Sequence, residues 1–230
     1  MSGDRRLGRP RLHLRVAGST NERARELAAA GAPHGTLVTA GEQTAGRGRQ
    51  GRTWAAPAGR ALLCSVIVRE PPRLLPLAAG VAVAKVVGDE ALLKWPNDVL
   101  VNGLKVAGIL VEGRPAERWV VVGIGLNVAL AESDFPPELR GRAGTLGLRA
   151  DAIEPMLATL LAALERWIEA PEADLLDAVR ARDALLGVSV RWAQGSGRGA
   201  GIDADGRLIV ATATAEVRLD AGEVHLQNDL

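Results

Sequence analysis

A run of alternating glycine and arginine, GRGRQGR from Gly46 to Arg52, is the first stretch of this 230-residue chain whose residue types could do chemistry. Glycine lets a backbone approach a ligand closely, and arginine supplies a permanently charged group suited to phosphate or carboxylate. So much glycine disfavours both helix and strand, so we expect a loop that binds an anion. Taken alone, the run is more typical of an exposed basic loop or a nucleic-acid contact, and it lacks the Gly-Lys-Ser/Thr of a P-loop.

A second polar group, KWPND at 94–98, ends a short apolar run. Lys94 can neutralise a phosphate, while Asn97 and Asp98 place polar groups at the end of the expected strand. Trp95 can pack on a ring or fill the core. Alone, the segment could equally be a tight turn with a solvated lysine.

Lys105 follows the strongest short hairpin signal in the chain, Asn102-Gly103. A lysine here either lies at the exposed end of the hairpin or points into a site. Strict strand alternation predicts that residues 105, 107, 109 and 111 share one face and that Glu112 lies on the other.

Two further segments have both a structural and a functional interpretation. GIGLNV at 123–128 is typical of a buried strand, but its glycines also suit a backbone that passes close to something flat. Asn127 has the donor and acceptor needed to bind an adenine edge. Ser19-Thr20-Asn21 is a helix cap, and hydroxyls at a cap can also bind a polar ligand.

Hydrophobic periodicity predicts the strands and helices that position these residues. Strands are predicted at 12–17, 36–43, 61–68, 91–96 and 118–128, with a hairpin within 98–113, and helices at 21–31, 74–87, 151–169 and 172–186. From Leu186–Gly187 onward the chain has five short β runs separated by turns, which indicate a small β-barrel beside the main domain. We therefore predict a domain boundary near residue 185.

Composition excludes several classes. The net charge of +1 argues against a general polyanion binder. Cys64 is the only cysteine, so an intrachain disulfide and a cysteine zinc site are excluded, and the three histidines are widely scattered. Since we find neither a signal-peptide pattern nor an apolar run long enough to span a membrane, we expect a cytoplasmic protein with no membrane partner.

Taken together, the order of these motifs closely resembles that of the biotin protein ligases, which join biotin to a lysine of a carrier protein. The matching segments are STN (19–21), QTAGRGRQGRTW (43–54), KWPNDV (94–99), KVAGILVE (105–112) and GIGLNV (123–128). GIDADGRLIV and GEVHL resemble the small terminal domain of that family. The resemblance implies an α+β fold, with a mixed β-sheet flanked by helices in a catalytic domain at 1–185 and an SH3-like β-barrel at 186–230. Because the first core strand starts near Arg11, we expect the monofunctional kind, without the N-terminal DNA-binding domain of some members.

The resemblance also implies a reaction in two steps: biotin and ATP form biotinyl-5′-AMP, and a lysine of the biotin carboxyl carrier protein then takes the biotinyl group. Mg²⁺ is expected to bridge phosphate oxygens, and no metal ligand is assigned among the side chains. The catalytic residues implied are Arg47, Arg49, Asp98 and Lys105. The biotin-binding residues implied are Ser19, Thr20, Asn21, Gln43, Gly46, Arg47, Gly48, Arg49 and Lys105. The ATP-binding and adenylate-binding residues implied are Arg49, Arg52, Trp54, Lys94, Asn97 and Asn127.

Two alternatives stay open at this point. A lipoate or octanoate ligase shares the fold but would lack the glycine–arginine run and KWPND. A nucleic-acid-binding module would use the basic loop, but the near-zero net charge, the absence of tyrosine and the few other aromatic residues argue against it.

Overall fold

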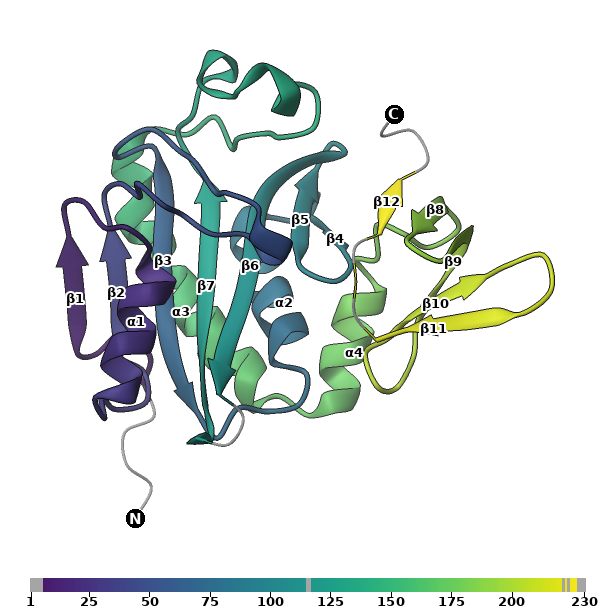
Figure 1. Ribbon diagram of the computed structural model, residues 1–230, viewed down its shortest axis with the longest axis horizontal. Coiled ribbons are helices and arrows are strands. Elements are labelled where there is room, and N and C mark those ends of the chain that lie inside the picture. Colours follow the sequence, from purple (N-terminus) through teal and green to yellow (C-terminus); the bar gives the residue numbers. More distant parts are fainter. Residues whose placement is uncertain (1–5, 115–116, 221, 223, 227–230) are drawn as a thin grey trace.

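A seven-stranded mixed sheet forms the centre of the computed structural model, which describes residues 6–114, 117–220, 222 and 224–226 (Figure 1). The order across the sheet is β1-β2-β3-β7-β6-β5-β4. Its strands are β1 (Arg11–Leu14), β2 (Leu37–Ala40), β3 (Ala61–Arg69), β4 (Leu92–Lys94), β5 (Asp98–Val101), β6 (Leu104–Arg114) and β7 (Trp119–Asn127). Only β1 and β2 pair in parallel among these neighbours, so the predicted mixed sheet is confirmed.

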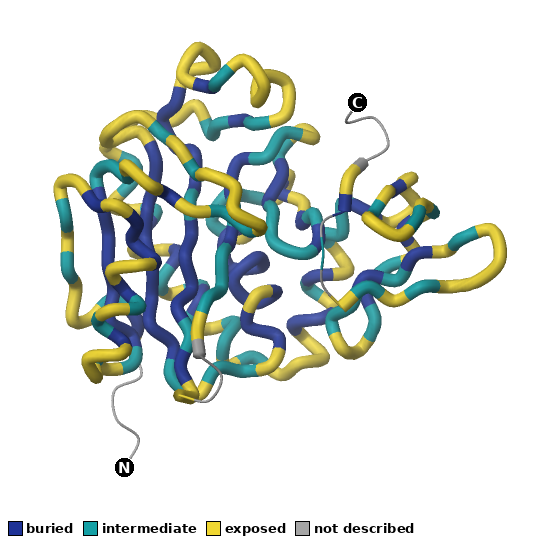
Figure 2. Tube along the Cα trace, in the orientation of Figure 1, coloured by how far each residue is buried: buried dark blue, intermediate teal, exposed yellow. Residues whose placement is uncertain are grey.

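Helices cover both faces of this sheet. Helix α1 (Thr20–Ala29) packs on one face, and α2 (Leu75–Val87), α3 (Ile153–Glu169) and α4 (Glu172–Arg180) contribute to the core on the other. The first eight residues of β3 are all buried because both of their faces are covered (Figure 2). None of the helices in the described ranges is both long and apolar enough to cross a membrane.

Helix α4 is shorter than the predicted 172–186 and ends at Arg180. The chain beyond it pairs with the edge strand β4: the Leu93 N–H donates to the Arg182 carbonyl at 2.7 Å, and the Ala184 N–H donates to the Leu93 carbonyl at 3.0 Å. These bonds satisfy backbone groups of the edge strand, and a continued helix could not make them.

A second sheet, of five short antiparallel strands, follows in the order β11-β10-β9-β8-β12. Its strands are β8 (Ser189–Trp192), β9 (Gly195–Ile202), β10 (Leu208–Ala211), β11 (Glu216–Leu219) and β12 (His225–Leu226). The predicted run of five short strands after residue 187 is confirmed. The boundary at residue 185 stays a prediction.

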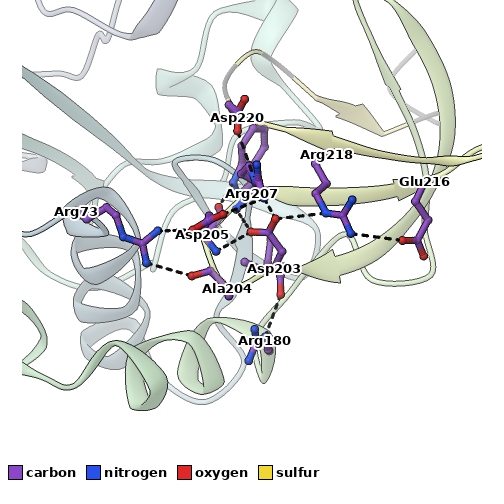
Figure 3. Close-up of polar contacts among 12 residues, drawn as sticks. Arg73, Arg180, Asp203, Ala204, Asp205, Arg207, Glu216, Arg218 and Asp220 are labelled. Carbon is purple, nitrogen blue, oxygen red and sulfur yellow. Dashed lines mark hydrogen bonds and ion pairs between the residues drawn. The ribbon is translucent and has the colours of Figure 1, made fainter.

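The turn between β9 and β10 connects the second sheet to the segment just before α2 (Figure 3). Arg73, just before α2, binds Asp205 of this turn at 3.0 Å, and the Trp95 indole N–H donates to the Gly206 carbonyl at 3.1 Å. Gly206 has a φ of +78°, and a Cβ there would lie 2.8 Å from side-chain carbons of Leu74 and Leu77. Glycine therefore allows the turn to lie directly against α2, where it also contacts Trp95 of the KWPND segment.

The predicted hairpin at Asn102-Gly103 is confirmed, with positive φ at both residues, as a type I′ turn requires. The alternation predicted for the following strand is confirmed beyond residue 106, where Ala107, Ile109 and Val111 share the core face and Glu112 lies on the other, but it is wrong for Lys105. The register shifts by one residue at that point: Leu100 pairs with Lys105, whereas Val99 pairs with Ala107. This β-bulge turns Lys105 toward the face that carries α1, where Glu112 also makes its contacts.

Candidate functional site

A cavity of about 340 Å³ opens on the face of the sheet that carries α1. It brings together nearly all of the predicted site residues: Ser19, Thr20, Asn21, Gln43, Arg47, Gly48, Arg49, Arg52, Trp54, Lys94, Asn97, Asp98, Lys105 and Asn127. The exception, Gly46, is buried in the loop beside the cavity, where a Cβ would lie 2.2 Å from the Trp54 carbonyl oxygen. Its lack of a side chain is what lets the two arms of the loop approach each other.

The glycine–arginine loop crosses in front of β7 and reaches β6 (Figure 1). Its arms are joined by backbone bonds, since the Trp54 N–H donates to the Gly46 carbonyl at 2.9 Å and the Gly48 N–H donates to the Arg52 carbonyl at 2.7 Å. The tip turns tightly over Arg49–Gly51, where Gln50 has a left-handed φ of +55° and the Arg52 N–H donates to the Arg49 carbonyl at 3.2 Å. The predicted loop is therefore present, and it holds its arginines over the cavity.

Arg49 links this loop to the KWPND segment, because its guanidinium donates to the Asn97 side-chain oxygen at 3.1 Å. Asn97 is itself fixed to β6: its side-chain nitrogen donates to the Ile109 carbonyl at 3.0 Å, and its own carbonyl accepts the Ile109 N–H. Two motifs about fifty positions apart in the chain thus meet on one strand.

Trp54 lies flat against glycines of two paired strands. A Cβ on Gly125 would lie 2.5 Å from the indole ring of Trp54, and a Cβ on Gly108 would lie 3.0 Å from it. Because Gly108 and Gly125 are directly paired, they form one smooth patch under the ring. The flat group that the glycine-spaced strand was expected to approach is thus, in this structure, the chain's own tryptophan.

Lys105 points into the cavity rather than away from the hairpin end. Its ammonium lies 2.7 Å from the Asp98 Oδ1 and 5.7 Å from the centre of the Trp54 ring. The alternative of a solvated lysine at the hairpin end is therefore excluded for this residue. Asp98 of β5 is paired with Lys94 across the β4–β5 ladder, so the two lysines reach the cavity from β4 and β6, the strands on either side of β5.

The charged side chains that line the cavity are predominantly cationic. Among the described residues that line the cavity, only Asp98 is acidic, whereas six are cationic: Arg47, Arg49, Arg52, Lys94, Lys105 and Arg142. Such an excess of fixed positive charge in a concave site attracts an anionic ligand.

The remaining predicted residues lie in the buried wall. Ser19 caps α1, as predicted, by accepting the Glu22 N–H, and the Thr20 N–H donates to the Gln43 side-chain oxygen at 2.8 Å. Asn127 is 4% exposed, and its side-chain nitrogen donates to the Gly144 carbonyl at 2.9 Å. The Asn127 amide therefore also holds the 143–146 segment against β7.

Sequence reasoning missed two polar residues behind this wall. Ser65, in the middle of β3, is fully buried and lies 2.8 Å from the Thr20 hydroxyl and 2.7 Å from the Asn21 side-chain oxygen. A lone hydroxyl in the apolar run ALLCSVIV was the available signal. Glu112, predicted on the face opposite Lys105, accepts a bond from the Asn21 side-chain nitrogen at 2.9 Å and lies 4.0 Å from Arg47.

Cys64, beside Ser65 on β3, faces the opposite core. Burial raises the pKa of its thiol to about 12, which keeps it protonated. It therefore takes no part in the chemistry of the cavity.

Comparison with known proteins places this chain in a family. Residues 14–128 match the Biotin/lipoate A/B protein ligase family. A Biotin--[acetyl-CoA-carboxylase] ligase of Mycobacterium tuberculosis is 38% identical over 91% of this chain and 86% of its own length. The Bifunctional ligase/repressor BirA of Bacillus spizizenii is 43% identical over 61% of this chain. The chain spans about half the length of the two Bacillus BirA proteins that it matches.

The solved structures agree. The biotin protein ligase of Aquifex aeolicus in complex with biotin and ATP superposes with a TM-score of 0.80 at 27% identity, over 96% of this chain and 99% of that one.

Proposed function

Because the chain belongs to the biotin/lipoate A/B protein ligase family, we propose that it activates biotin with ATP to biotinyl-5′-AMP and transfers biotin to the acceptor lysine of a biotin carboxyl carrier protein. The observation that carries this proposal is the cavity in which Lys105 and the arginines of the glycine–arginine loop face one space. The solved relative that holds biotin and ATP together supports it.

The first step brings two anions together, the carboxylate of biotin and the α-phosphate of ATP. At about 4 Å and an effective dielectric near 20, each pair of unit charges repels by roughly 4 kcal/mol. Lys105 is proposed to lie between the two groups and offset this repulsion, with Arg47 and Arg49 assisting. Asp98 holds the Lys105 ammonium at 2.7 Å and thereby orients it for that role. Catalysis then rests on positioning and electrostatics rather than on a covalent nucleophile.

Biotin and the nucleotide are assigned to different parts of the cavity. The polar wall of Ser19, Thr20 and Gln43 suits the ureido ring of biotin, and Gly46 and Gly48 let the loop backbone approach it. Arg49, Arg52, Lys94 and Asn97 suit the phosphates. Trp54 and Asn127 are proposed to hold the adenine by packing and by hydrogen bonding, respectively.

Mg²⁺ fits this lining as an ion held mainly by substrate phosphates. It prefers one or two carboxylates together with phosphate and water oxygens, and Asp98 supplies the one carboxylate among the described lining residues. Bound there, the ion would neutralise phosphate charge. In the second step, Asp98 is proposed to accept the proton of the incoming carrier lysine.

The second sheet is proposed to be the SH3-like barrel of the family, in a domain that begins near residue 186. Its five short antiparallel strands support that proposal. Since Val224 and His225 line the cavity, this domain also contributes to the site.

Exchange of pyrophosphate into ATP, measured separately with biotin, lipoate and octanoate, tests the proposed function. Of the three acids, we expect only biotin to support exchange. After an apo carrier domain is added, the mass of that domain should increase by one biotinyl group on one lysine. Exchange driven by lipoate or octanoate but not by biotin would instead make the protein a lipoate-type ligase.

A further inference from the structure

Four polar side chains from three elements form a continuous chain behind the cavity: Glu112 of β6, Asn21 and Thr20 of α1, and Ser65 of β3. Ser65 is fully buried, and Thr20 and Asn21 are each 4% exposed. The neighbouring strand also makes room for this chain, because a Cβ on Gly123 would lie 2.1 Å from the Asn21 side-chain oxygen. Burying polar groups costs free energy that apolar side chains in the same space would not cost. The hydrogen bonds of these four side chains therefore call for a functional explanation.

Glu112 determines which way the Asn21 amide faces. The Asn21 side-chain nitrogen lies 2.9 Å from a carboxylate oxygen of Glu112 and 3.3 Å from the Leu110 carbonyl oxygen. A carboxylate and a carbonyl only accept hydrogen bonds, so the nitrogen must face them and the Asn21 oxygen must face Ser65. Arg25 and Arg47 lie 3.7 and 4.0 Å from the other Glu112 oxygen and balance its charge.

The direction of the next hydrogen bonds follows from counting protons. The Ser65 hydroxyl has one proton, and it donates to the Asn21 oxygen at 2.7 Å, because that oxygen can only accept. No proton of Ser65 remains for Thr20, whose hydroxyl oxygen is 2.8 Å away. The Thr20 proton therefore points to the Ser65 oxygen or to the Gln43 oxygen at 3.1 Å. In both arrangements it stays within the protein.

We propose that Glu112, Asn21 and Ser65 are positioning residues that fix the Thr20 hydroxyl as a hydrogen-bond acceptor toward the cavity. The site then selects a ligand with an N–H donor at that point, such as the cyclic urea of biotin, over an isostere with an oxygen there. This inference rests on the proposed function and adds to it the source of selectivity for the ring. Asn21 acts through its neighbours in this scheme, since the contacts of its amide lie within the protein.

Calorimetric titration of Ser65→Ala tests the assignment with three ligands: biotin and the two cyclic carbamates in which an oxygen replaces one or the other ring N–H. Wild type should bind biotin more tightly than either carbamate. Without Ser65, one of the two acceptors that hold the Thr20 proton is lost, so the hydroxyl rotates more freely and can donate to a ring oxygen. For the carbamate whose oxygen faces Thr20, the preference for biotin should fall by about tenfold. Thr36→Ala is the matched control, because it removes a buried hydroxyl that donates to the Pro33 carbonyl and not to any member of the network.

Glu112→Gln provides a second, independent variant. A glutamine can donate to the Asn21 oxygen, which allows the amide to reverse and the directions of the network to change. The preference of Glu112→Gln for biotin over the carbamate should also fall. In the double variant Ser65→Ala/Glu112→Gln this preference should fall no further than in the more affected single variant, because both changes act on the same hydrogen-bond network.

Two results would overturn the assignment: an unchanged preference in folded Ser65→Ala, or fully additive losses in the double variant. Both presuppose that wild type binds biotin. A wild-type protein that does not bind biotin would instead refute the proposed function, and this assignment with it.

Discussion

The ammonium of Lys105 lies 2.7 Å from the Asp98 Oδ1, across the two strands joined by the Asn102-Gly103 turn. The carboxylate holds the lysine over the cavity, where Trp54 forms one wall. In the proposed reaction, this pair would provide a cation that is already oriented when the two anionic substrates arrive, so that little reorganisation is needed.

Lys105→Ala should reduce biotin-dependent pyrophosphate exchange by about 10²- to 10³-fold, because the charge proposed to lie between the two reacting anions is lost. Far-ultraviolet circular dichroism should show the native fold. The control is Lys85→Ala, an exposed lysine on α2 that does not line the cavity, and it should exchange at the wild-type rate. Normal exchange in Lys105→Ala would remove this residue from the mechanism.

Arg49→Gly should release biotinyl-AMP faster than wild type, because the hydrogen bond between the loop and Asn97 is lost. Release can be followed by rapid gel filtration of enzyme loaded with radiolabelled intermediate. Gln50→Gly is the matched control. It introduces a glycine at the neighbouring residue, whose own φ is +55°, and it keeps the Arg49 guanidinium. Equal retention of the intermediate by Arg49→Gly and wild type would contradict the proposed closure.

Residues 46–53 should exchange amide hydrogen more slowly when biotin and ATP are bound. The loop is joined to itself by only a few backbone bonds, including those of Gly48 and Trp54, so we expect it to open readily in the free protein and to close over the labile anhydride. Hydrogen–deuterium exchange by mass spectrometry measures this, with the buried strand β3 as internal reference. Identical protection with and without ligand would rule out a closing loop.

Gly125→Ala should raise the KM for ATP by about tenfold or more, because the new Cβ would lie 2.5 Å from the Trp54 ring and must displace it from the proposed adenine site. Gly80→Ala is a suitable control. Gly80 lies in the interior of α2, and the nearest heavy atom to a Cβ there, a side-chain carbon of Leu93, is 3.4 Å away. Steady-state kinetics with varied ATP would show the difference, and equal KM values would separate Trp54 from nucleotide binding.

The buried thiol of Cys64 predicts a loss of stability at alkaline pH. Its pKa is raised from 9.0 to about 12 in the folded chain, so above pH 9 the unfolded state loses a proton that the native state keeps. The free energy of unfolding should therefore fall with rising pH between about 9 and 12. Relative to Cys64→Ala, wild type should lose about 1 kcal/mol between pH 8 and pH 10 in urea titrations. Parallel curves for the two proteins would contradict the raised pKa.

Much of the fold was predictable because its signals are local. The cap at Ser19, the Asn102-Gly103 turn and the apolar run of β3 each depend on a few neighbouring residues, and the structure has them as expected. The end of α4 was not predictable, because pairing of residues 182–184 with β4 is a contact between distant segments.

The sequence by itself determined which chemical groups are present: a basic glycine-rich loop, two lysines beside short strands, and polar residues at a helix cap. Tertiary structure decided where they point. One extra residue in the bulge moved Lys105 out of the alternation and onto the face where the site forms, which also carries Glu112. The physical reason is that side chains alternate with a period of two, so a single inserted residue exchanges the faces of a strand, and only the pairing with the neighbouring strand reveals it.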